Sequence, residues 1–199
     1  MKTDDKAYEE YLQSKFLPGR RQYLEYLVYP RYLQEFPELT EICDLGFGNG
    51  EFLTFCRGKG IAALGIDSNP HFVASAVSSG LNVKQDDITR LSTIADGKLS
   101  AAISDNVLEH LDRDGLFALF RTLTVKLAPH GVFLVIVPGK RGFSTDPTHK
   151  TFIDQSLIEE LTLGSALTLK RSFRWPINVN WVSRIWRLNM SVFVIKKSP

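Results

Sequence analysis

CDLGFGNGEF, residues 43–52, places three glycines at alternate positions directly after a short apolar run. Gly46, Gly48 and Gly50 leave the main chain there with almost no side-chain cover. Glycine lets a ligand lie against the backbone, and the free amides at the start of a following helix attract negative charge. Open α/β sheets bind their ligands where a strand runs through glycines into a helix. The stretch therefore predicts a strand, a turn and a helix, with a binding site at the turn.

Apolar runs alternate with helix-like segments on both sides of this turn. We expect five strands, at residues 38–46, 61–67, 81–87, 98–105 and 132–139, and helices at 51–60, at 70–79 and from 113 to a stop at Pro129 and Gly131. Continuous apolar strands that alternate with helices indicate a parallel sheet covered on both faces. The fold class is therefore α/β, as a single doubly wound sheet.

The pattern changes after residue 150. A further helix is expected behind Asp154 as its N-cap. Two strand-like stretches follow, at 165–175 and 187–197, and we expect them to pair at the edge of the sheet. An aromatic and basic insertion near 171–188 holds all three tryptophans and four arginines. We favour a roof over an acceptor pocket for this insertion, and the alternative is peripheral contact with an anionic membrane.

All six tyrosines lie within residues 1–37. This segment is expected to be a helical cap of the same domain, packed on the sheet, and residues 38–199 form the rest of that domain. Whether the cap also closes over a bound ligand is left open by the sequence.

The bulk composition is that of an ordinary globular domain, with 44% hydrophobic residues and a formal net charge of +2. That charge gives no strong signal for nucleic acid. Cys43 and Cys56 lie in apolar runs without metal-ligand spacing, which indicates a reducing compartment. No secretory signal and no bilayer-spanning run of about 20 apolar residues is visible, so a cytoplasmic location is expected.

The glycine pattern discriminates between cofactor classes. A dinucleotide site uses G-x-G-x-x-G, but the third position counted from Gly46 is Glu51, bulky and negative where a pyrophosphate would lie. This disfavours a nicotinamide dehydrogenase. The phosphate-binding G-x-x-x-x-G-K-[ST] pattern is also absent from the sequence. What stands here is D-x-G-x-G-x-G, which begins at Asp44.

With these residues the chain resembles the class I S-adenosylmethionine-dependent methyltransferases over roughly residues 41–155. The resemblance implies a Rossmann-like methyltransferase fold, with a mostly parallel seven-stranded sheet and an antiparallel last strand. It also implies S-adenosyl-L-methionine as cofactor. The residues it implies for the cofactor site are Asp44, Gly46, Phe47, Gly48 and Gly50 at the methionine portion, Asp67 and Ser68 at the ribose, Asp87 and Ile88 at the adenine, and Asp105 and Asn106 after the fourth strand.

Two positions qualify this resemblance. Phe47 stands where many relatives carry a small residue or cysteine, and it packs either on the cofactor or on the N-terminal cap. Asp86 competes with Asp87 for the adenine position, because either register fits the third-strand motif.

The candidate catalytic residues are His149 and His110. Imidazole titrates near pH 6.5 and suits a general base for a hydroxyl acceptor. The alternative for His149 is a loop residue that caps the helix near Asp154, and the alternative for His110 is a residue that only orders its loop. No metal is expected, although Glu109, His110 and His149 resemble part of a divalent site whose first glutamate is replaced here by Asn106.

The acceptor class follows from what the fourth-strand motif lacks. Asn-Pro-Pro-Tyr and Asp-Pro-Pro-Tyr, which the resembling family uses for nitrogen acceptors, do not occur. We therefore expect methyl transfer to a hydroxyl or carboxyl oxygen of a small-molecule, sugar or lipid-linked acceptor. The alternative is a non-catalytic regulatory protein that binds S-adenosylmethionine. The sequence makes no prediction of the oligomeric state.

Overall fold

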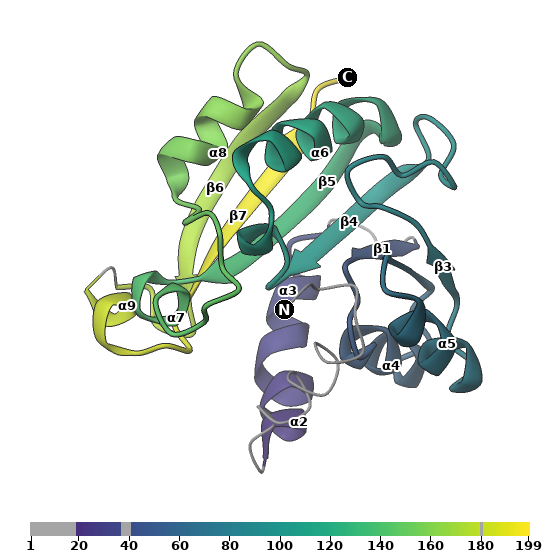
Figure 1. Cartoon of the computed structure of the whole chain (residues 1–199), viewed down its shortest axis with the longest axis horizontal. Helices are drawn as coiled ribbons and strands as arrows, with labels where there is room; N and C mark the ends of the chain where they lie inside the picture. The colour runs from purple at the N-terminus through teal and green to yellow at the C-terminus, as the bar shows by residue number, and fades with distance from the viewer. Residues whose placement is uncertain (1–18, 37–40, 180) are drawn as a thin grey trace.

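The computed structural model describes residues 19–36, 41–179 and 181–199. Its centre is a seven-stranded sheet in the order β3-β2-β1-β4-β5-β7-β6 (Figure 1). The strands are β1 Ile42–Leu45, β2 Ala63–Asp67, β3 Val83–Gln85, β4 Leu99–Asp105, β5 Leu127–Pro138, β6 Leu167–Trp175 and β7 Met190–Lys197. Strands β1 to β5 pair in parallel, and β7 runs antiparallel to both β5 and β6. The predicted α/β class, the mostly parallel sheet and the antiparallel last strand are confirmed.

Helices lie on both faces of this sheet (Figure 1). They are α2 Arg20–Tyr23, η1 Leu24–Val28, α3 Tyr29–Leu33, α4 Glu51–Gly58, α5 Pro70–Ser78, η2 Leu108–His110, α6 Arg113–Lys126, α7 Lys140–Phe143, α8 Gln155–Thr162 and α9 Val182–Ile185. In the described residues, none of these helices is long and apolar enough to cross a bilayer.

Two apolar cores explain why the helices sit where they do. On one face, α6 and α8 bury residues such as Phe120 and Ile158 against Phe133 and Phe193 of the sheet. Burial of this kind contributes about 1.5–3 kcal/mol for each large side chain. The other face is covered by α4 and the N-terminal helices. The strands between the two cores therefore read as continuous apolar runs in the sequence.

The described part of the N-terminal cap, residues 19–36, packs on the sheet as expected. Tyr29 and Tyr32 are buried, whereas Tyr26 is 74% exposed. At the end of this segment the buried Glu35 accepts hydrogen bonds from Arg31, at 2.5 Å, and from Arg171 of β6. Residues 1–18, which carry two of the six tyrosines, lie outside the described residues.

One expected boundary is wrong. Helix α6 ends at Lys126 rather than at Pro129, because the backbone is already extended at Leu127 and β5 begins there. The start of β5 is irregular, with a register shift opposite β4. A side chain at Gly131 would meet the carbonyl oxygen of Leu99 at 2.8 Å, so the chain crosses closely over its neighbour.

The strand expected at 165–175 is observed as β6, which takes up the first residues of the aromatic insertion. The chain between β6 and β7 therefore spans residues 176–189. Its helix α9 is a single turn. The predicted pairing of the last two strands at the sheet edge is confirmed, with β6 outermost.

The N-cap of α8 provides a test of the fold. The Asp154 side chain accepts a hydrogen bond from the Leu157 amide at 3.0 Å, as the sequence predicts. Asp154→Ala should lower the free energy of unfolding by about 1 kcal/mol, since one helix amide loses its partner. Urea unfolding measures this change. Asp114→Ala, at an exposed acid that caps no helix, should change stability by no more than a few tenths of a kcal/mol, and an equal loss there would contradict the assignment.

Candidate functional site

The glycine turn lies between β1 and α4, and its backbone explains its composition. Gly46, Gly48 and Gly50 have φ values of +82°, +52° and +71°, which L side chains rarely adopt. Gly46 is also constrained by its surroundings, because an added Cβ would lie 2.6 Å from the Val107 side chain. An added Cβ at Gly48 would meet nothing within 4 Å. The turn therefore presents bare main chain to open space at Gly48.

Asp67 joins this turn to the end of β2. Its carboxylate accepts hydrogen bonds from the amides of Gly48, at 3.0 Å, and Asn69, at 2.8 Å. Burial raises the pKa of Asp67, and these amide bonds oppose that rise. The two motifs that the sequence placed 19 residues apart therefore meet in one hydrogen-bonded unit.

A cavity of about 500 Å³ opens at this end of the sheet and gathers most of the predicted residues. The predicted residues that line it are Asp44, Gly46, Phe47, Gly48, Asp67, Ser68, Asp87, Ile88, Asp105, Asn106, His110 and His149. Gly50 is outside this lining and serves as the N-cap of α4. A single cavity therefore holds both the glycine turn and the two histidines.

Three carboxyl groups at neighbouring strand ends make one side of the cavity acidic. Burial raises the pKa of Asp44 well above its usual range, and the nearby Asp105 and Asp67 raise it further. Burial also raises the pKa of Asp105 to about 7, an effect opposed by Arg20 and reinforced by Glu51. Each of these carboxylates is costly to ionise without a cation close by.

Of the two candidate acids in the third-strand motif, Asp87 is the one that lies at the cavity. Asp87 and Ile88 line the cavity. Asp86 instead accepts hydrogen bonds from the Thr93 amide, at 2.7 Å, and the Ser92 hydroxyl, at 2.9 Å. Asp86 therefore stabilises the following loop, and the register that places Asp87 in the site is the one the structure adopts.

Phe47 belongs to a small core with Leu53, Phe72 and Ala76, which holds no residue from the described part of the N-terminal cap. A Cβ at Gly65 of β2 would lie 2.6 Å from the Phe47 ring, so the ring fits against a strand that has no side chain there. Of the two alternatives for Phe47, its place in the cavity lining agrees with packing on the cofactor.

The histidines form a second group with Glu109, farther along the same cavity. The rings of His110 and His149 are 4.9 Å apart, and the His149 ring stacks on Phe143. His149 Nδ1 lies 2.9 Å from the Phe143 carbonyl oxygen, and its Nε2 lies 3.8 Å from Glu109 Oε1. Because a carbonyl only accepts, Nδ1 carries the proton in the neutral ring and Nε2 keeps its lone pair. His149 therefore does not cap α8, whose cap is Asp154.

Glu109, His110 and His149 each offer one ligand atom within 4.8 Å of the others, an arrangement that can hold a divalent cation. The Glu109 carboxyl is buried, and neither of its oxygens has a hydrogen-bond partner among the described residues. Burial raises the pKa of Glu109 well above its usual range, which favours the neutral carboxyl, a poor metal ligand. That no metal binds here stays a prediction.

Several lining residues were not assigned to the site from the sequence. Arg20, Tyr23 and Tyr29 reach the cavity from the N-terminal helices. Arg20 also pairs with Glu51 at 2.9 Å, which ties α2 to the first turn of α4. The density of tyrosines in residues 1–37 was the only sequence signal for this part of the lining. From the sequence it was open whether the cap closes over a ligand, and the contacts of Arg20, Tyr23 and Tyr29 with the cavity support such closure.

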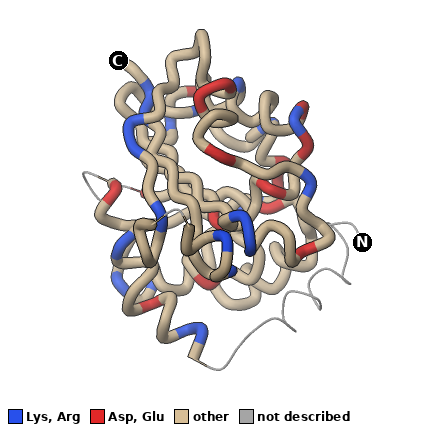
Figure 2. Tube along the Cα trace, turned by 90° about the vertical axis from the view of Figure 1, so that its left-hand side faces the viewer, with Lys and Arg blue, Asp and Glu red and all other residues tan. Residues whose placement is uncertain are grey.

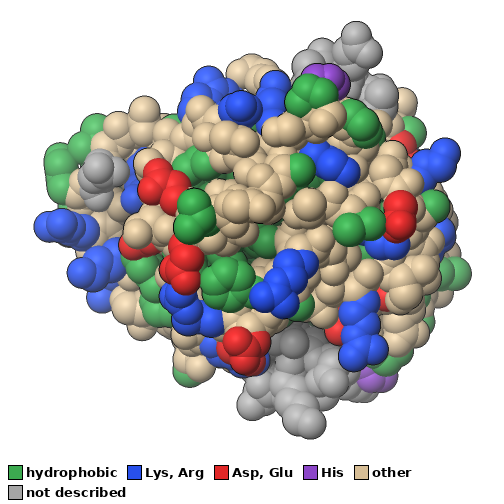
Figure 3. Space-filling model, turned by 90° about the horizontal axis from the view of Figure 1, so that it is seen from above, with side chains coloured by type: hydrophobic (Ala, Val, Ile, Leu, Met, Phe, Trp, Pro, Cys, Tyr) green, Lys and Arg blue, Asp and Glu red, His purple; other side chains and the backbone are tan. Residues whose placement is uncertain are grey.

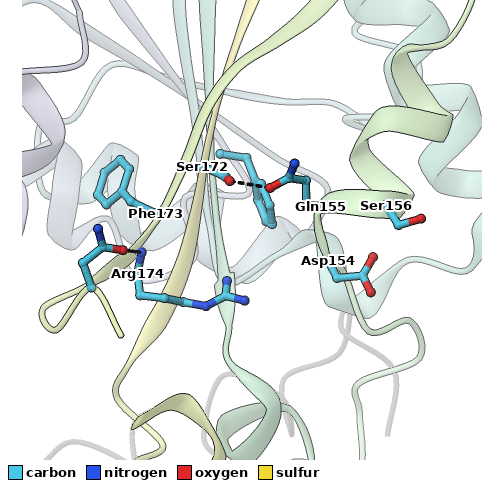
Figure 4. A pocket seen from close by; sticks show the side chains of 8 residues that line it. Asp154, Gln155, Ser156, Ser172, Phe173 and Arg174 are labelled. Carbon is cyan, nitrogen blue, oxygen red and sulfur yellow. Dashed lines mark hydrogen bonds between the residues drawn. The ribbon is translucent and has the colours of Figure 1, made fainter. Parts of the chain in front are cut away.

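A second cavity of about 500 Å³ lies at the sheet edge, between β6 and α8 (Figure 4). Ser172 donates a hydrogen bond to Gln155 at 2.7 Å across it, and Asn178 accepts one from the Arg174 amide at 2.9 Å. Burial lowers the pKa of Arg174 from its usual value. None of the predicted site residues lines this cavity.

Asp105 makes the stability of the fold depend on pH. An unfolded carboxyl titrates near about 3.9, whereas Asp105 in the folded chain titrates at about 7. Its contribution to stability is therefore full below about pH 4 and is lost as the pH rises through about 7. In Asp105→Asn the amide stays neutral, so the Tm of the variant relative to the unsubstituted protein should rise between pH 5 and pH 8. Calorimetric scans at both pH values test this, and an unchanged Tm difference would contradict it.

Comparison with known proteins places this geometry in a family. A family model described as a methyltransferase domain matches residues 9–176, which is most of the chain. No curated protein sequence matches. Among solved structures, a SAM-dependent methyltransferase from Archaeoglobus fulgidus has a TM-score of 0.69 at 22% identity, over 95% of this chain and 99% of that one.

Two further solved structures share the fold at lower identity. An S-adenosylmethionine-dependent methyltransferase from Clostridium acetobutylicum has a TM-score of 0.69 at 12% identity, over 97% of both chains. Geranyl diphosphate C-methyltransferase from Streptomyces coelicolor has a TM-score of 0.69 at 9% identity, over 85% of this chain and 74% of that one. These likenesses show the fold, and the family model shows the family. The chain therefore belongs to the methyltransferase domain family and is a class I S-adenosylmethionine-dependent methyltransferase, with S-adenosylmethionine as its cofactor.

Proposed function

We propose that this enzyme transfers the methyl group of S-adenosylmethionine to an oxygen atom of a small-molecule, sugar or lipid-linked acceptor. The observation that carries the proposal is the single cavity that joins the acidic glycine turn to the pair of histidines. The charge of the glycine turn supports the cofactor assignment, and the histidines in the same cavity support a proton acceptor for a hydroxyl.

The residues at the glycine turn fit this cofactor by charge. When bound, S-adenosylmethionine supplies a methyl group activated by a sulfonium cation. Asp44 and Asp105 are carboxyls whose pKa values are raised by burial, so a cation between them offsets the cost of their ionisation. Asp67 is a carboxylate able to accept from both hydroxyls of a ribose. The open backbone at Gly48 leaves room for the ligand beside it.

The histidine group supplies the acceptor chemistry. His149 is held by the Phe143 carbonyl oxygen and by stacking on the Phe143 ring, so its Nε2 keeps one direction. A neutral imidazole in this tautomer accepts a proton at Nε2. Glu109 Oε1 lies 3.8 Å from that nitrogen, which is beyond hydrogen-bond distance. A carboxyl acceptor already ionised at neutral pH needs no such base, so the histidine favours a hydroxyl.

The choice of acceptor atom rests on a motif that the sequence lacks and on the position of His149. The absence of Asn-Pro-Pro-Tyr disfavours nitrogen. One structural neighbour is by name a C-methyltransferase of geranyl diphosphate, so the fold also serves carbon acceptors. A base placed by two fixed contacts is the observation that favours a hydroxyl here. Family membership argues against the non-catalytic regulatory alternative.

Asp67→Ala tests the cofactor assignment. The variant should bind S-adenosylhomocysteine more weakly by about 1.5–3 kcal/mol, because hydrogen bonds to a charged group are lost. Isothermal titration calorimetry measures the change. Asp67 also holds Gly48 and Asn69, so the Tm of the free variant must be recorded beside it. Asp86→Ala is the matched control, and an unchanged affinity for Asp67→Ala would reject the assignment.

His149→Gln tests the base. With a panel of phenols, sugars and long-chain alcohols, formation of S-adenosylhomocysteine should fall about 10²–10⁴-fold, while calorimetric cofactor binding is retained. His71→Gln, on the exposed side of α5, should have no effect. Exhaustive chelation should leave wild-type activity unchanged, since no metal is expected. A loss restored only by added Mg²⁺, Mn²⁺ or Zn²⁺ would assign the trio to a metal and contradict the base.

A further inference from the structure

The insertion between β6 and β7 concentrates exposed apolar side chains. Of the eleven large hydrophobic residues exposed in the described part of the chain, five fall within residues 177–188: Ile177, Val179, Trp181, Ile185 and Leu188. Trp181 is 61% exposed and Ile185 is 67% exposed. Single exposed apolar residues are ordinary, whereas a cluster of this kind marks an interaction site.

This segment is fixed to the fold rather than loosely attached. Val182 and Ser183 of α9 are buried. A side chain at Gly139 would meet the carbonyl oxygen of Asn189 at 2.4 Å, so the segment lies directly on the loop before α7. The Asn189 side chain accepts a hydrogen bond from the Ile177 amide at 3.1 Å and closes the segment into a loop. Trp181 and Ile185 are therefore held outward by packing beneath them.

Basic residues surround the same apolar cluster. Arg184 and Arg187 lie within it, and Lys140 and Arg141 come from the adjacent helix α7; all four are exposed (Figure 1). The sequence has no acidic residue from 176 to its last position, 199. Figure 2 turns the side that carries α7 and α9 toward the viewer, with its Lys and Arg in blue. The face over α6 and α8, in contrast, mixes both signs of charge (Figure 3).

The cluster is continuous with the mouth of the functional cavity. Arg187 and Leu188 belong both to the exposed surface and to the cavity lining, and Met190 follows them. Whatever binds this surface therefore lies beside the opening through which an acceptor reaches His149.

We propose that these nine residues, called here the α9 surface, bind the interface of an anionic lipid bilayer. Tryptophan and aliphatic side chains enter the boundary between headgroups and acyl chains, and basic residues beside them are attracted to an anionic surface. The consequence for the substrate rests on the proposed function: an enzyme docked in this way draws an amphiphilic, lipid-linked acceptor from the bilayer into its cavity.

Co-sedimentation with vesicles tests the docking independently of methyl transfer. The full chain should sediment with phosphatidylcholine vesicles containing 30% phosphatidylglycerol at about 0.1 M salt, and much less with pure phosphatidylcholine or at about 1 M salt. Trp181→Ser with Ile185→Ser, and separately Arg184→Glu, should each lower binding at least five-fold. Absence of binding to the anionic vesicles at low salt would overturn the proposal.

Matched controls come from the opposite face. Leu163→Ser, at a side chain 84% exposed, and Arg121→Glu, on α6, should leave vesicle binding unchanged. Equal losses in these variants would show that the protein binds vesicles through its net charge or through non-specific hydrophobic contact, and would overturn the proposal. So would light scattering that shows a dimer abolished by Trp181→Ser with Ile185→Ser, because a second copy would then cover the surface. Since Trp181, Ile185 and Arg184 lie outside the cavity lining, turnover of any water-soluble acceptor should persist in these variants.

Discussion

Carboxyl groups brought together without enough cations around them are the constraint on which the site depends. Asp44, Asp67 and Asp105 lie at or next to the ends of the three adjacent strands β1, β2 and β4, where Asp44 and Asp67 are buried and Asp105 is half-buried. Burial and mutual repulsion raise the pKa of Asp44 well above its usual range. Carboxyl groups with raised pKa values that line one cavity mark a candidate ligand site. In the proposed function, a sulfonium-bearing cofactor would offset part of the cost of ionising them.

The order of the strands explains why these acids converge. From β1 the chain adds β2 and β3 on one side and then returns to place β4 and β5 on the other. Ligands bind at this point of reversal in open α/β sheets, because the loops that follow β1 and β4 diverge there. The N-terminal helices cover the crevice, held at α2 by Arg20 and Glu51 and at the far end by Arg171 and Glu35. The cap is thereby joined both to the glycine turn and to the edge strand.

The sequence predicted what short-range spacing determines. The glycine turn, the acid that ends β2 and the Asp154 cap were all found, since each depends on neighbours within a few residues. The contact of Arg20 with Glu51 spans 31 positions and has no local signature, so the contribution of the cap to the cavity was missed. The end of α6 was placed too late because Pro129 looks like a helix stop, whereas β5 already begins at Leu127.

The charges along the cavity bear on the acceptor. Asp44 and Asp105 line it at the glycine turn together with the oppositely charged Arg20. Around His149 the carboxyl oxygens of Glu109 and Asp146 lie 3.8 Å and 3.9 Å from its Nε2, and the neighbouring Lys150 belongs to the same lining. Both regions therefore hold charges of both signs, so net charge alone does not assign the two reactants to them. Arg187 belongs both to this lining and to the exposed α9 surface. Under the proposed docking on anionic lipid, it would link the surface that meets the headgroups to the cavity that takes the acceptor.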